Sequence, residues 1–535
     1  MLIKPDLKNV LIPLVVLLVL LFSCKKVSDP NEGSDLVINY DLLETTITLR
    51  FVDAASGEFI PDNANLEVKP MGGQAAAVLD ISGRSKEAYQ GKMGVVELAL
   101  KPGHGPASGT AFSLQLYIRA SGYFSTGFSE VLTEKGPHIY EIRLMKRVDL
   151  PEGASRGTGE SYSDGQGRVT QSTDVSVSNN MASLLVPEGA VLKGPGNSPL
   201  IGNLNINIYH FSNLEDVCLQ SFPGTLKAFA SLPDGENRQV MLFPAGHVFM
   251  SINDQNGMFA KTIEGKPLML SMNVPPETYK GAGNSQIEDG DMVPVWHFNE
   301  QEANWSLEFA DTISQFFTGG YRINSAISSL SWWSFAWYED NLCQNGLRLD
   351  FSDNEIPCDC YWVKLEARNT HNQGFLWQEY RRFCKGQPLS VKNVPAVLPV
   401  DLYISGMCGE LSTTEDFYGI TNLCSQYLLD VEWNQHETFS AFQLELTAYC
   451  NQNEAVKIKP GFGVWYRKTD DFCWQWSAMK SGKAELCHMQ PGVDYQIGFY
   501  YDGNWEEFRV VPQYGNYIYH DFTLTAEVCS EVFGY

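Results

Sequence analysis

The stretch SLSWWSFAWYED, residues 329–340, gathers five large aromatic side chains within seven positions. Successive side chains of a β-strand point to opposite faces, so about half of this set is expected in a hydrophobic core. Trp332 and Trp333 point in opposite directions if the stretch is extended, which predicts that one of them reaches the surface. We therefore expect a strand whose aromatic side chains mainly pack in a core. Trp332, Trp333 and Trp337 are the candidate ligand-binding residues if the alternatives, contact with a protein or a glycan, apply.

The rest of the chain repeats this strand pattern in short pieces. TTITLRFVD (45–53), VDLYISG (400–406) and FQLELTAY (442–449) alternate apolar and polar residues and are rich in β-branched and aromatic side chains. Gly- and Pro-rich turn signals separate such stretches, and no long amphipathic helix pattern occurs. The pattern predicts an all-β protein of tandem β-sandwich domains, arranged as a rod that presents surfaces and encloses no cavity.

Cysteine is concentrated near the C-terminus. Ten of the 12 cysteines lie between Cys343 and Cys529, while the isolated Cys218 is expected to be a buried thiol. An even set of ten in an exported chain predicts a disulfide framework whose pairing the sequence leaves open. Two separate disulfides are expected to leave the strand at Cys358 and Cys360. The disulfide candidates are Cys343, Cys358, Cys360, Cys384, Cys408, Cys424, Cys450, Cys473, Cys487 and Cys529.

All 12 tryptophans lie at or after Trp296, and a second dense aromatic group begins at Trp465. This group adds Trp474 and Trp476 to the candidate ligand-binding residues, with the same alternatives as for the first group.

Composition limits the function classes. The formal net charge of −25 argues against binding to nucleic acid or to anionic lipid. The nine histidines are scattered without metal-ligand spacing, and neither a G-x-S-x-G elbow nor a phosphate-binding glycine pattern occurs. Cys487-His488 lacks the C-x-x-C spacing usual in thiolate metal sites. We expect no metal, no cofactor and no enzymatic activity, with a hydrolase of dispersed active site as an alternative.

The chain begins with an apolar run, Val10–Phe22, of thirteen residues. A membrane span needs roughly 20 apolar residues, so the run is typical of a secretory signal instead. Leu21-Phe22-Ser23-Cys24 resembles a bacterial lipobox. That resemblance implies cleavage before Cys24 and acylation of its thiol and amine, which would anchor the mature chain in a membrane. The polar segment KKVSDPNEGSD (25–35) is typical of a flexible tether. Its acidic residues Asp29 and Glu32 resemble the acidic residues that follow the lipid cysteine in surface-exported lipoproteins of the Bacteroidota, although they lie later in the chain than in that pattern.

Two further resemblances concern the N-terminal half. FVDAASGEFIPDNANLEV (51–68) followed by YIRASGYFSTGFSEVL (117–132) resembles the transthyretin-like, carboxypeptidase-regulatory type of domain. The segments around Pro187, Gly189 and Ala190, and around Val295, Trp296, Phe298 and Trp305, resemble a β-sandwich of surface proteins that include cartilage intermediate layer protein. Both resemblances imply structural or binding modules.

The predicted organisation is a lipoprotein signal peptide followed by tandem Ig-like or transthyretin-like β-sandwiches. The segments are a signal peptide (1–23), a lipidated tether (24–39), a transthyretin-like β-sandwich (40–147), a linker (148–169), a second β-sandwich region (170–328), a Cys/Trp-rich β-sandwich (329–428) and a C-terminal Cys/Trp-rich β-sandwich (429–535).

These features together predict a non-catalytic lipoprotein of the outer membrane, exposed at the cell surface and held by its N-terminal lipid. We expect it to act in binding or scaffolding, as an accessory subunit with an outer-membrane protein partner or as an adhesin. The main alternative is a glycan-binding lipoprotein of a nutrient-uptake system.

Overall fold

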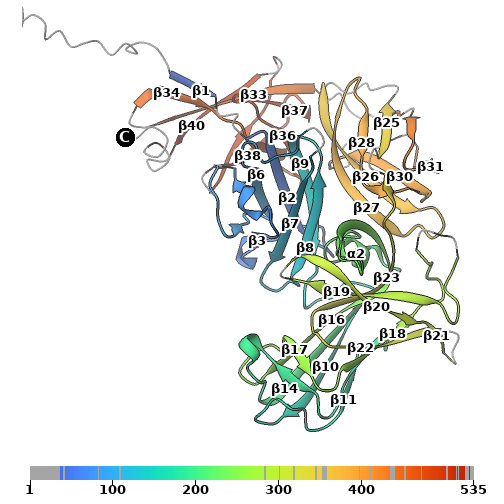
Figure 1. The fold of residues 1–535 in the computed structure, drawn as a ribbon. Helices are drawn as coiled ribbons and strands as arrows, with labels where there is room; N and C mark the ends of the chain where they lie inside the picture. Colours follow the sequence, from blue (N-terminus) through green and yellow to red (C-terminus); the bar gives the residue numbers. More distant parts are fainter. Residues whose placement is uncertain are drawn as a thin grey trace, which may run out of the picture.

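The computed structural model describes residues 36–39 and 43–529 with short gaps, and this part of the chain is almost entirely β-structure (Figure 1). The gaps are residues 82, 108–109, 282, 284, 301, 317–319, 344–345, 352–357, 397, 409–410, 412, 414, 430, 434–439, 451–452, 472, 502–503, 514, 516 and 525–528. The described residues contain one short α-helix, α2 (Asp216–Gln220), and the 3₁₀ turns η1 (Asp62–Ala64), η2 (Ala75–Ala77) and η3 (Pro195–Asn197). The predicted all-β class of tandem sandwiches is confirmed, while the predicted signal peptide and Cys24 lie outside the described residues.

The first unit, residues 43–147, is a sandwich of two four-stranded sheets. Its strands are β2 (Thr45–Asp53), β3 (Glu67–Pro70), β4 (Val78–Asp80), β5 (Tyr89–Gln90), β6 (Val95–Leu100), β7 (Phe112–Arg119), β8 (Thr126–Leu132) and β9 (Gly136–Leu144). The sheet orders are β4-β6-β2-β9 and β5-β3-β7-β8. The alternation along β7 buries Phe112, Leu114, Leu116 and Ile118 in the core between the sheets, as the period-two pattern requires.

The second unit, residues 148–340, combines a sandwich with a small closed barrel. Its strands are β10 (Ala154–Ser163), β11 (Thr173–Ser176), β12 (Ala182–Val186), β13 (Val191–Lys193), β14 (Gly202–Phe211), β15 (Lys227–Ser231), β16 (Asn237–Asp254), β17 (Thr262–Glu264), β18 (Leu268–Val274), β19 (Met292–Asn299), β20 (Asn304–Thr312), β21 (Ser314–Gln315), β22 (Tyr321–Ile327) and β23 (Trp332–Glu339). The order β10-β14-β16-β15-β20-β19-β23 closes on itself because β23 also pairs with β16. A second sheet, β11-β12-β18-β22-β21, faces it.

The third unit, residues 341–433, and the fourth unit, residues 440–529 together with β1, complete the molecule. The third unit contains β24 (Leu342–Cys343), β25 (Leu347–Phe351), β26 (Cys360–Asn369), β27 (Phe375–Cys384), β28 (Leu389–Val391), β29 (Val394–Pro395), β30 (Val400–Gly406), β31 (Tyr418–Ile420) and β32 (Gln426–Leu429). The fourth contains β1 (Leu36–Asn39), β33 (Ser440–Cys450), β34 (Asn453–Lys459), β35 (Gly463–Lys468), β36 (Gln475–Ala478), β37 (Lys483–Met489), β38 (Tyr495–Tyr501), β39 (Asn504–Val510) and β40 (Tyr517–Leu524). The larger sheets have orders β27-β26-β30-β31 in the third unit, and β1-β34-β33-β37, with β40 on β33, and β36-β35-β38-β39 in the fourth.

Three segment predictions need correction. The predicted linker 148–169 contains β10, which pairs with β14 over ten residues. Its Gly- and Ser-rich composition reflects close packing, because a Cβ on Gly157 would lie 2.2 Å from the carbonyl oxygen of Ser176. Residues 332–339 pair with β16 and β19, so they end the second unit and do not open the third. Residues 36–39 of the predicted tether form β1, which lies parallel to β34.

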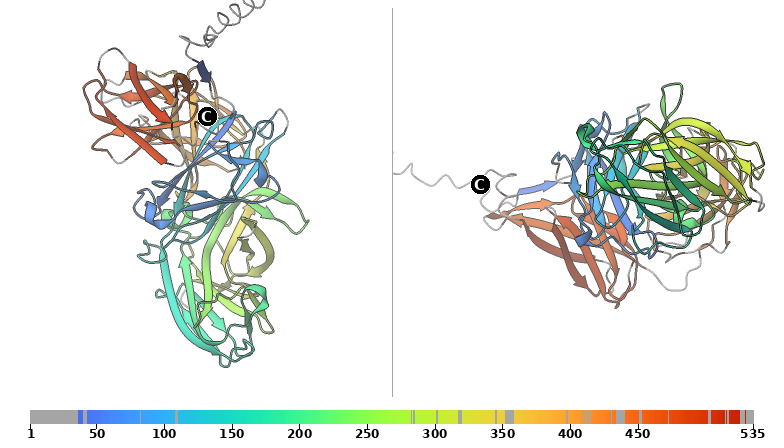
Figure 2. Two further views of the ribbon diagram at one scale, coloured as in Figure 1. Left: turned by 90° about the vertical axis from the view of Figure 1, so that its left-hand side faces the viewer. Right: turned by 90° about the horizontal axis from the view of Figure 1, so that it is seen from below.

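The four units do not form a rod. One continuous hydrophobic core joins the barrel of the second unit to the third unit and includes Phe124 and Met145 of the first. A second cluster contains Val95 and Ile139 of the first unit, Trp362 and other residues of the third, and Trp476 and other residues of the fourth. The first unit is therefore in contact with the other three, with the second unit at the far end of the molecule from the fourth (Figures 1 and 2).

All ten candidate cysteines form disulfides, which confirms the predicted framework. Cys343–Cys424 and Cys360–Cys384 lie within the third unit, and Cys450–Cys529 lies within the fourth. Cys358–Cys487 and Cys408–Cys473 connect the third unit to the fourth. Cys358 and Cys360 belong to separate disulfides, as expected, and Cys218 is a free buried thiol.

A buried group of charges joins three units. Lys227 Nζ on β15 lies 2.7 Å from an Oε atom of Glu379 on β27 and 3.2 Å from an Oε atom of Glu130 on β8. Arg381 also pairs with Glu379. Burial alone would raise the pKa of Glu379, but the Arg381 and Lys227 charges hold it below its ordinary value. The carboxylate is therefore ionised, and these charges fix how the first three units meet.

Replacing Lys227 by Met is expected to cost about 3–5 kcal/mol of unfolding free energy, because it leaves Glu130 and Glu379 buried with too little positive charge. Lys392→Met removes an exposed pair with Glu134 between the same first and third units and should cost about 1 kcal/mol or less. Denaturant unfolding of both variants measures the difference. Equal costs would contradict the assignment of the buried group.

Candidate functional site

The structure buries the tryptophans that the sequence offered as ligand-binding candidates. Trp332 and Trp333 are each 2% exposed and do point in opposite directions, but each enters a different hydrophobic core. The prediction that one of them reaches the surface is wrong, because β23 is covered on both faces. Trp337 is only partly exposed, and its Nε1 donates to the carbonyl oxygen of Met292 at 3.1 Å.

Trp474 and Trp476 are each 4% exposed, so they too are unavailable as a surface platform. They belong to the aromatic cluster between the first, third and fourth units, where Trp474 lies under the guanidinium of Arg467 at 4.5 Å. Glu97 of the first unit faces Trp465 and Trp476, and burial raises the pKa of its carboxyl to about 8. The second aromatic group is therefore the contact by which the fourth unit packs on the first.

Trp332 joins the first and second units. Its ring centroid lies 5.3 Å from that of Phe124 in the first unit and 5.1 Å from those of Phe211 and Phe249 in the second. Its Nε1 donates to the carbonyl oxygen of Ser125 at 3.1 Å. These contacts hold the start of β8 against β23 and thereby fix the position of the residues that follow Phe124.

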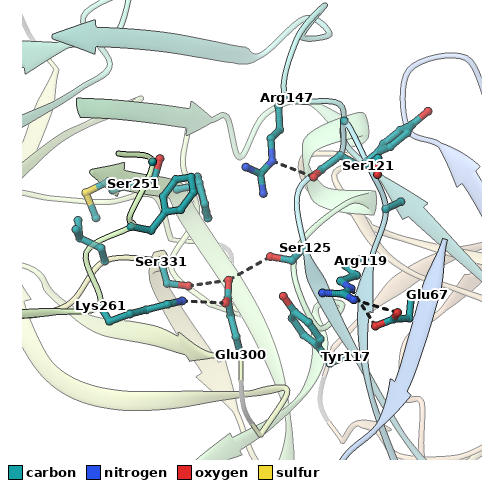
Figure 3. Close-up of a pocket in the computed structure, with 18 of the residues that line it drawn as sticks. Glu67, Tyr117, Arg119, Ser121, Ser125, Arg147, Ser251, Lys261, Glu300 and Ser331 are labelled. Carbon is teal, nitrogen blue, oxygen red and sulfur yellow. Dashed lines mark hydrogen bonds and ion pairs between the residues drawn. The ribbon is translucent and has the colours of Figure 1, made fainter. Parts of the chain in front are cut away.

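A cleft lined by charged, polar and apolar side chains lies beside this contact, between the first and second units (Figure 3). Its volume is about 830 Å³, and it is open to the surface. The first unit contributes residues of β3, β7 and the segments after β7 and β9, and the second contributes residues of β16, its following turn and the segment before β23. The described lining residues include neither histidine nor cysteine.

Glu300 lies at the centre of the cleft and accepts hydrogen bonds from both units. Its Oε1 is 3.1 Å from Ser125 Oγ of the first unit and 3.5 Å from Ser331 Oγ of the second. Lys261 Nζ lies 4.0 Å from Oε2 (Figure 3). Tyr117 lies nearby, and burial together with the Glu300 charge raises the pKa of its hydroxyl, so it is a hydrogen-bond donor at neutral pH.

Arg147 supplies the positive charge on the opposite side of the cleft. Its Nε donates to the carbonyl oxygen of Tyr123 at 2.9 Å, and its guanidinium lies over the rings of Phe124 and Phe249 at 5.5 and 5.7 Å. These contacts hold the planar guanidinium group, the Arg147 fork, in place. Figure 3 shows this group directed into the space between the units. A fork fixed in this way can bind a carboxylate or pair with hydroxyl and carbonyl oxygens.

Sequence reasoning did not find the cleft. Arg119 and Glu67 at its edge are 52 positions apart and form an ion pair with an N–O distance of 2.9 Å, while Ser125 and Glu300 are 175 apart. No local motif connects such residues, because the cleft exists only where two separately folded sandwiches meet.

Cys358, Glu485 and Cys487 bring potential metal-ligand atoms within 4.8 Å of one another. Both sulfur atoms belong to one disulfide, so neither is a thiolate, and the group does not fit a metal ion as the chain stands. In the part of the chain that the structure describes, no helix is long and apolar enough for a membrane span.

No family model matches the sequence, and no curated protein is detectably similar to it. Solved structures give distant likenesses. A streptococcal ancillary pilin is 8% identical over 44% of this chain and 93% of its own, with a TM-score of 0.15. The minor pilin GBS52 of Streptococcus agalactiae is 9% identical over 34% of this chain and 94% of its own, with a TM-score of 0.14. The Bacillus anthracis TIE protein is 8% identical over 76% of this chain and 71% of its own, with a TM-score of 0.15. Likenesses of this size do not identify a function.

Trp332→Phe is expected to lower the unfolding free energy by about 1–3 kcal/mol, because it removes the hydrogen bond to Ser125 and leaves a cavity between two units. Trp505→Phe is the matched control, since Trp505 is partly exposed and lies in the fourth unit. Denaturant unfolding measures both costs. A loss for the control as large as that for Trp332→Phe would contradict the role given to Trp332.

His247 predicts a pH dependence of stability. It is 1% exposed and stacks on Phe211 at 4.9 Å, and burial lowers its pKa to about 3. The unfolded chain, with a His pKa near 6.5, binds the proton that the folded chain excludes. Stability from this residue is therefore full above pH 6.5 and falls by roughly 1.4 kcal/mol per pH unit below it.

His247→Phe should reduce the loss of stability between pH 7 and pH 5, as measured by denaturant unfolding at both values. His104→Phe, at an exposed position of the first unit, should leave the loss unchanged. An unaltered pH dependence in His247→Phe would contradict the assignment.

Proposed function

We propose that this chain is a cell-surface lipoprotein of a bacterial outer membrane that binds other molecules and does not transform them. The lipobox-like Leu21–Cys24 supports attachment through a lipid at Cys24. The five disulfides support a location in an oxidising compartment outside the cytoplasm. The role that fits these features is that of an accessory subunit for an outer-membrane protein or of an adhesin.

The observation that carries this proposal is the cleft between the first two units. Its charged groups already have partners, since Arg119 pairs with Glu67 and Glu300 accepts from Ser125 and Ser331. Both walls are held by the contacts of Trp332 and Arg147, so the cleft is formed before a ligand arrives. A preformed cleft of about 830 Å³, lined both by these charged groups and by apolar side chains such as Met258 and Phe259, suits recognition of an extended segment that offers polar and apolar groups.

The chemistry of the cleft favours two classes of ligand. The Arg147 fork and the Glu300 carboxylate together match a polypeptide segment. Its carbonyl oxygens or an acidic side chain would accept from Arg147, and its N–H groups would donate to Glu300. A glycan is the second candidate, because Phe259 is 48% exposed on the cleft lining and offers a ring face for stacking against a sugar.

Site-specific photo-crosslinking in intact cells tests the proposal. A photoreactive residue at position 261, an exposed lysine of the cleft, should form a discrete crosslinked product. The same residue at position 266, an exposed lysine of the second unit outside the cleft lining, should form none. Arg147→Ala should reduce the product several-fold, because it removes the fork without touching the crosslinking site.

Affinity electrophoresis of the wild-type chain and Arg147→Ala through polysaccharide gels separates the two ligand classes. Retardation that Arg147→Ala abolishes would assign the cleft to a glycan. Equal crosslinking from positions 261 and 266, together with no retardation in any gel, would contradict binding at the cleft.

A further inference from the structure

The fourth unit exposes two stacked tyrosines. Tyr517 and Tyr519 on β40 are 64% and 70% exposed, and their ring centroids lie 6.0 Å apart with an interplanar angle of 9°. Ile518 between them is 5% exposed and packs in the core of the unit. The two tyrosines therefore lie on the outer face of the sheet, and the described part of the chain leaves most of their surface exposed to solvent.

The strand that carries them is at the edge of its sheet. Among the described strands, β40 pairs with β33, through a parallel register that sets Tyr517 beside Gln443 and Tyr519 beside Glu445. An exposed edge strand with large aromatic side chains promotes association unless another surface covers it. We therefore expect another surface to cover this face of the sheet when the protein is in place.

The first described strand of the chain, β1, belongs to the same sheet. β1 pairs with β34 from Leu36 to Asn39, and β34 pairs with β33, so the sheet runs β1-β34-β33-β40. Eleven residues lie between Cys24 and Leu36. A chain of that length spans at most about 40 Å, so a lipid on Cys24 would keep this sheet close to the membrane. β1 lies beside β34 in the fourth unit, and the second unit lies at the opposite end of the molecule (Figures 1 and 2).

Tyrosine suits the polar surface of a bilayer. Its ring enters the boundary between headgroups and acyl chains while its hydroxyl stays hydrated. Charge does not favour anionic lipid here, because the chain is strongly acidic, Asp521 is exposed on the same face and Lys459 is paired with Glu445 at 2.7 Å. Neutral headgroups are therefore the better match.

We propose that the outer face of the β1-β34-β33-β40 sheet docks on the headgroup layer of the membrane through Tyr517 and Tyr519. The inference rests on the proposed lipid anchor at Cys24. It makes the fourth unit the membrane-facing end and turns the second unit away from the bilayer. The cleft between the first and second units then opens in the part of the molecule that an external partner can reach.

Hydroxyl-radical footprinting with mass spectrometry tests the orientation on native side chains. The lipidated mature chain is placed on vesicles of phosphatidylcholine and phosphatidylethanolamine, and compared with the mature polypeptide that begins at Lys25 and has no acyl chain. Oxidation of Tyr517 and Tyr519 should fall several-fold on vesicles. Tyr162 on β10 of the second unit, which is 51% exposed, should be oxidised equally in both samples.

A paired variant isolates the two tyrosines. On vesicles, hydrogen exchange of the β40 amides should be slower than in solution for the lipidated wild-type chain and for Tyr162→Ser. The lipidated double variant Tyr517→Ser/Tyr519→Ser should lose this slowing while it stays bound to the vesicles through its lipid.

The outcomes separate this inference from the function on which it rests. A lipidated, vesicle-bound chain with Tyr517 and Tyr162 equally oxidised overturns the docking face alone. Protection of Tyr517 that grows with protein concentration in the acyl-free chain assigns the face to a second copy and also overturns it. Absence of an acyl mass on Cys24 overturns the anchor and this inference together.

Discussion

Burial of β23 on both faces is the constraint on which the arrangement of the molecule depends. A strand in a two-layer sandwich usually has one covered face, and its alternate side chains meet solvent. β23 closes the barrel of the second unit through β16 and β19, so Trp333 and Phe335 enter the sandwich core while Trp332 and Ala336 enter the core shared with the third unit. Because Trp332 also contacts Phe124 and Ser125, the same strand positions the first unit. The cleft is a geometric consequence of that contact.

The sequence predicted what alternation determines and missed what distant contacts determine. Strands, the all-β class, the set of disulfide-bonded cysteines and the opposite directions of Trp332 and Trp333 follow from local patterns. The surface position assigned to one of these tryptophans does not, because exposure depends on which other strands cover the face. The linker prediction for residues 154–163 was wrong because composition alone is ambiguous. Small residues are typical of a flexible linker, but here they permit β10 to pack closely on β11.

The contacts between units could not be predicted from local sequence patterns either. Lys227, Glu130 and Glu379 come from three units, and each would be read in sequence as a solvated charge. Buried charges contribute little net stability because desolvation offsets their attraction. Their effect here is on specificity, since a packing that separated Lys227 from Glu130 and Glu379 while keeping them buried would leave these charges without their partners. The two disulfides between the third and fourth units restrict the remaining freedom covalently.

Such restriction has a direct consequence for recognition. A string of sandwiches on flexible linkers would have to order its units before it could present a cleft between them, and that ordering opposes binding. In this chain the ordering occurs during folding, because Trp332, Arg147 and Glu300 each have partners in place across or beside the cleft. Under the proposed binding role, a ligand meets a fixed guanidinium and a fixed carboxylate, and its affinity is set by how well its own polar groups match their spacing. A ligand whose polar groups do not match that spacing would desolvate Glu300 or Arg147 without replacing the contacts with water that they lose, which disfavours its binding.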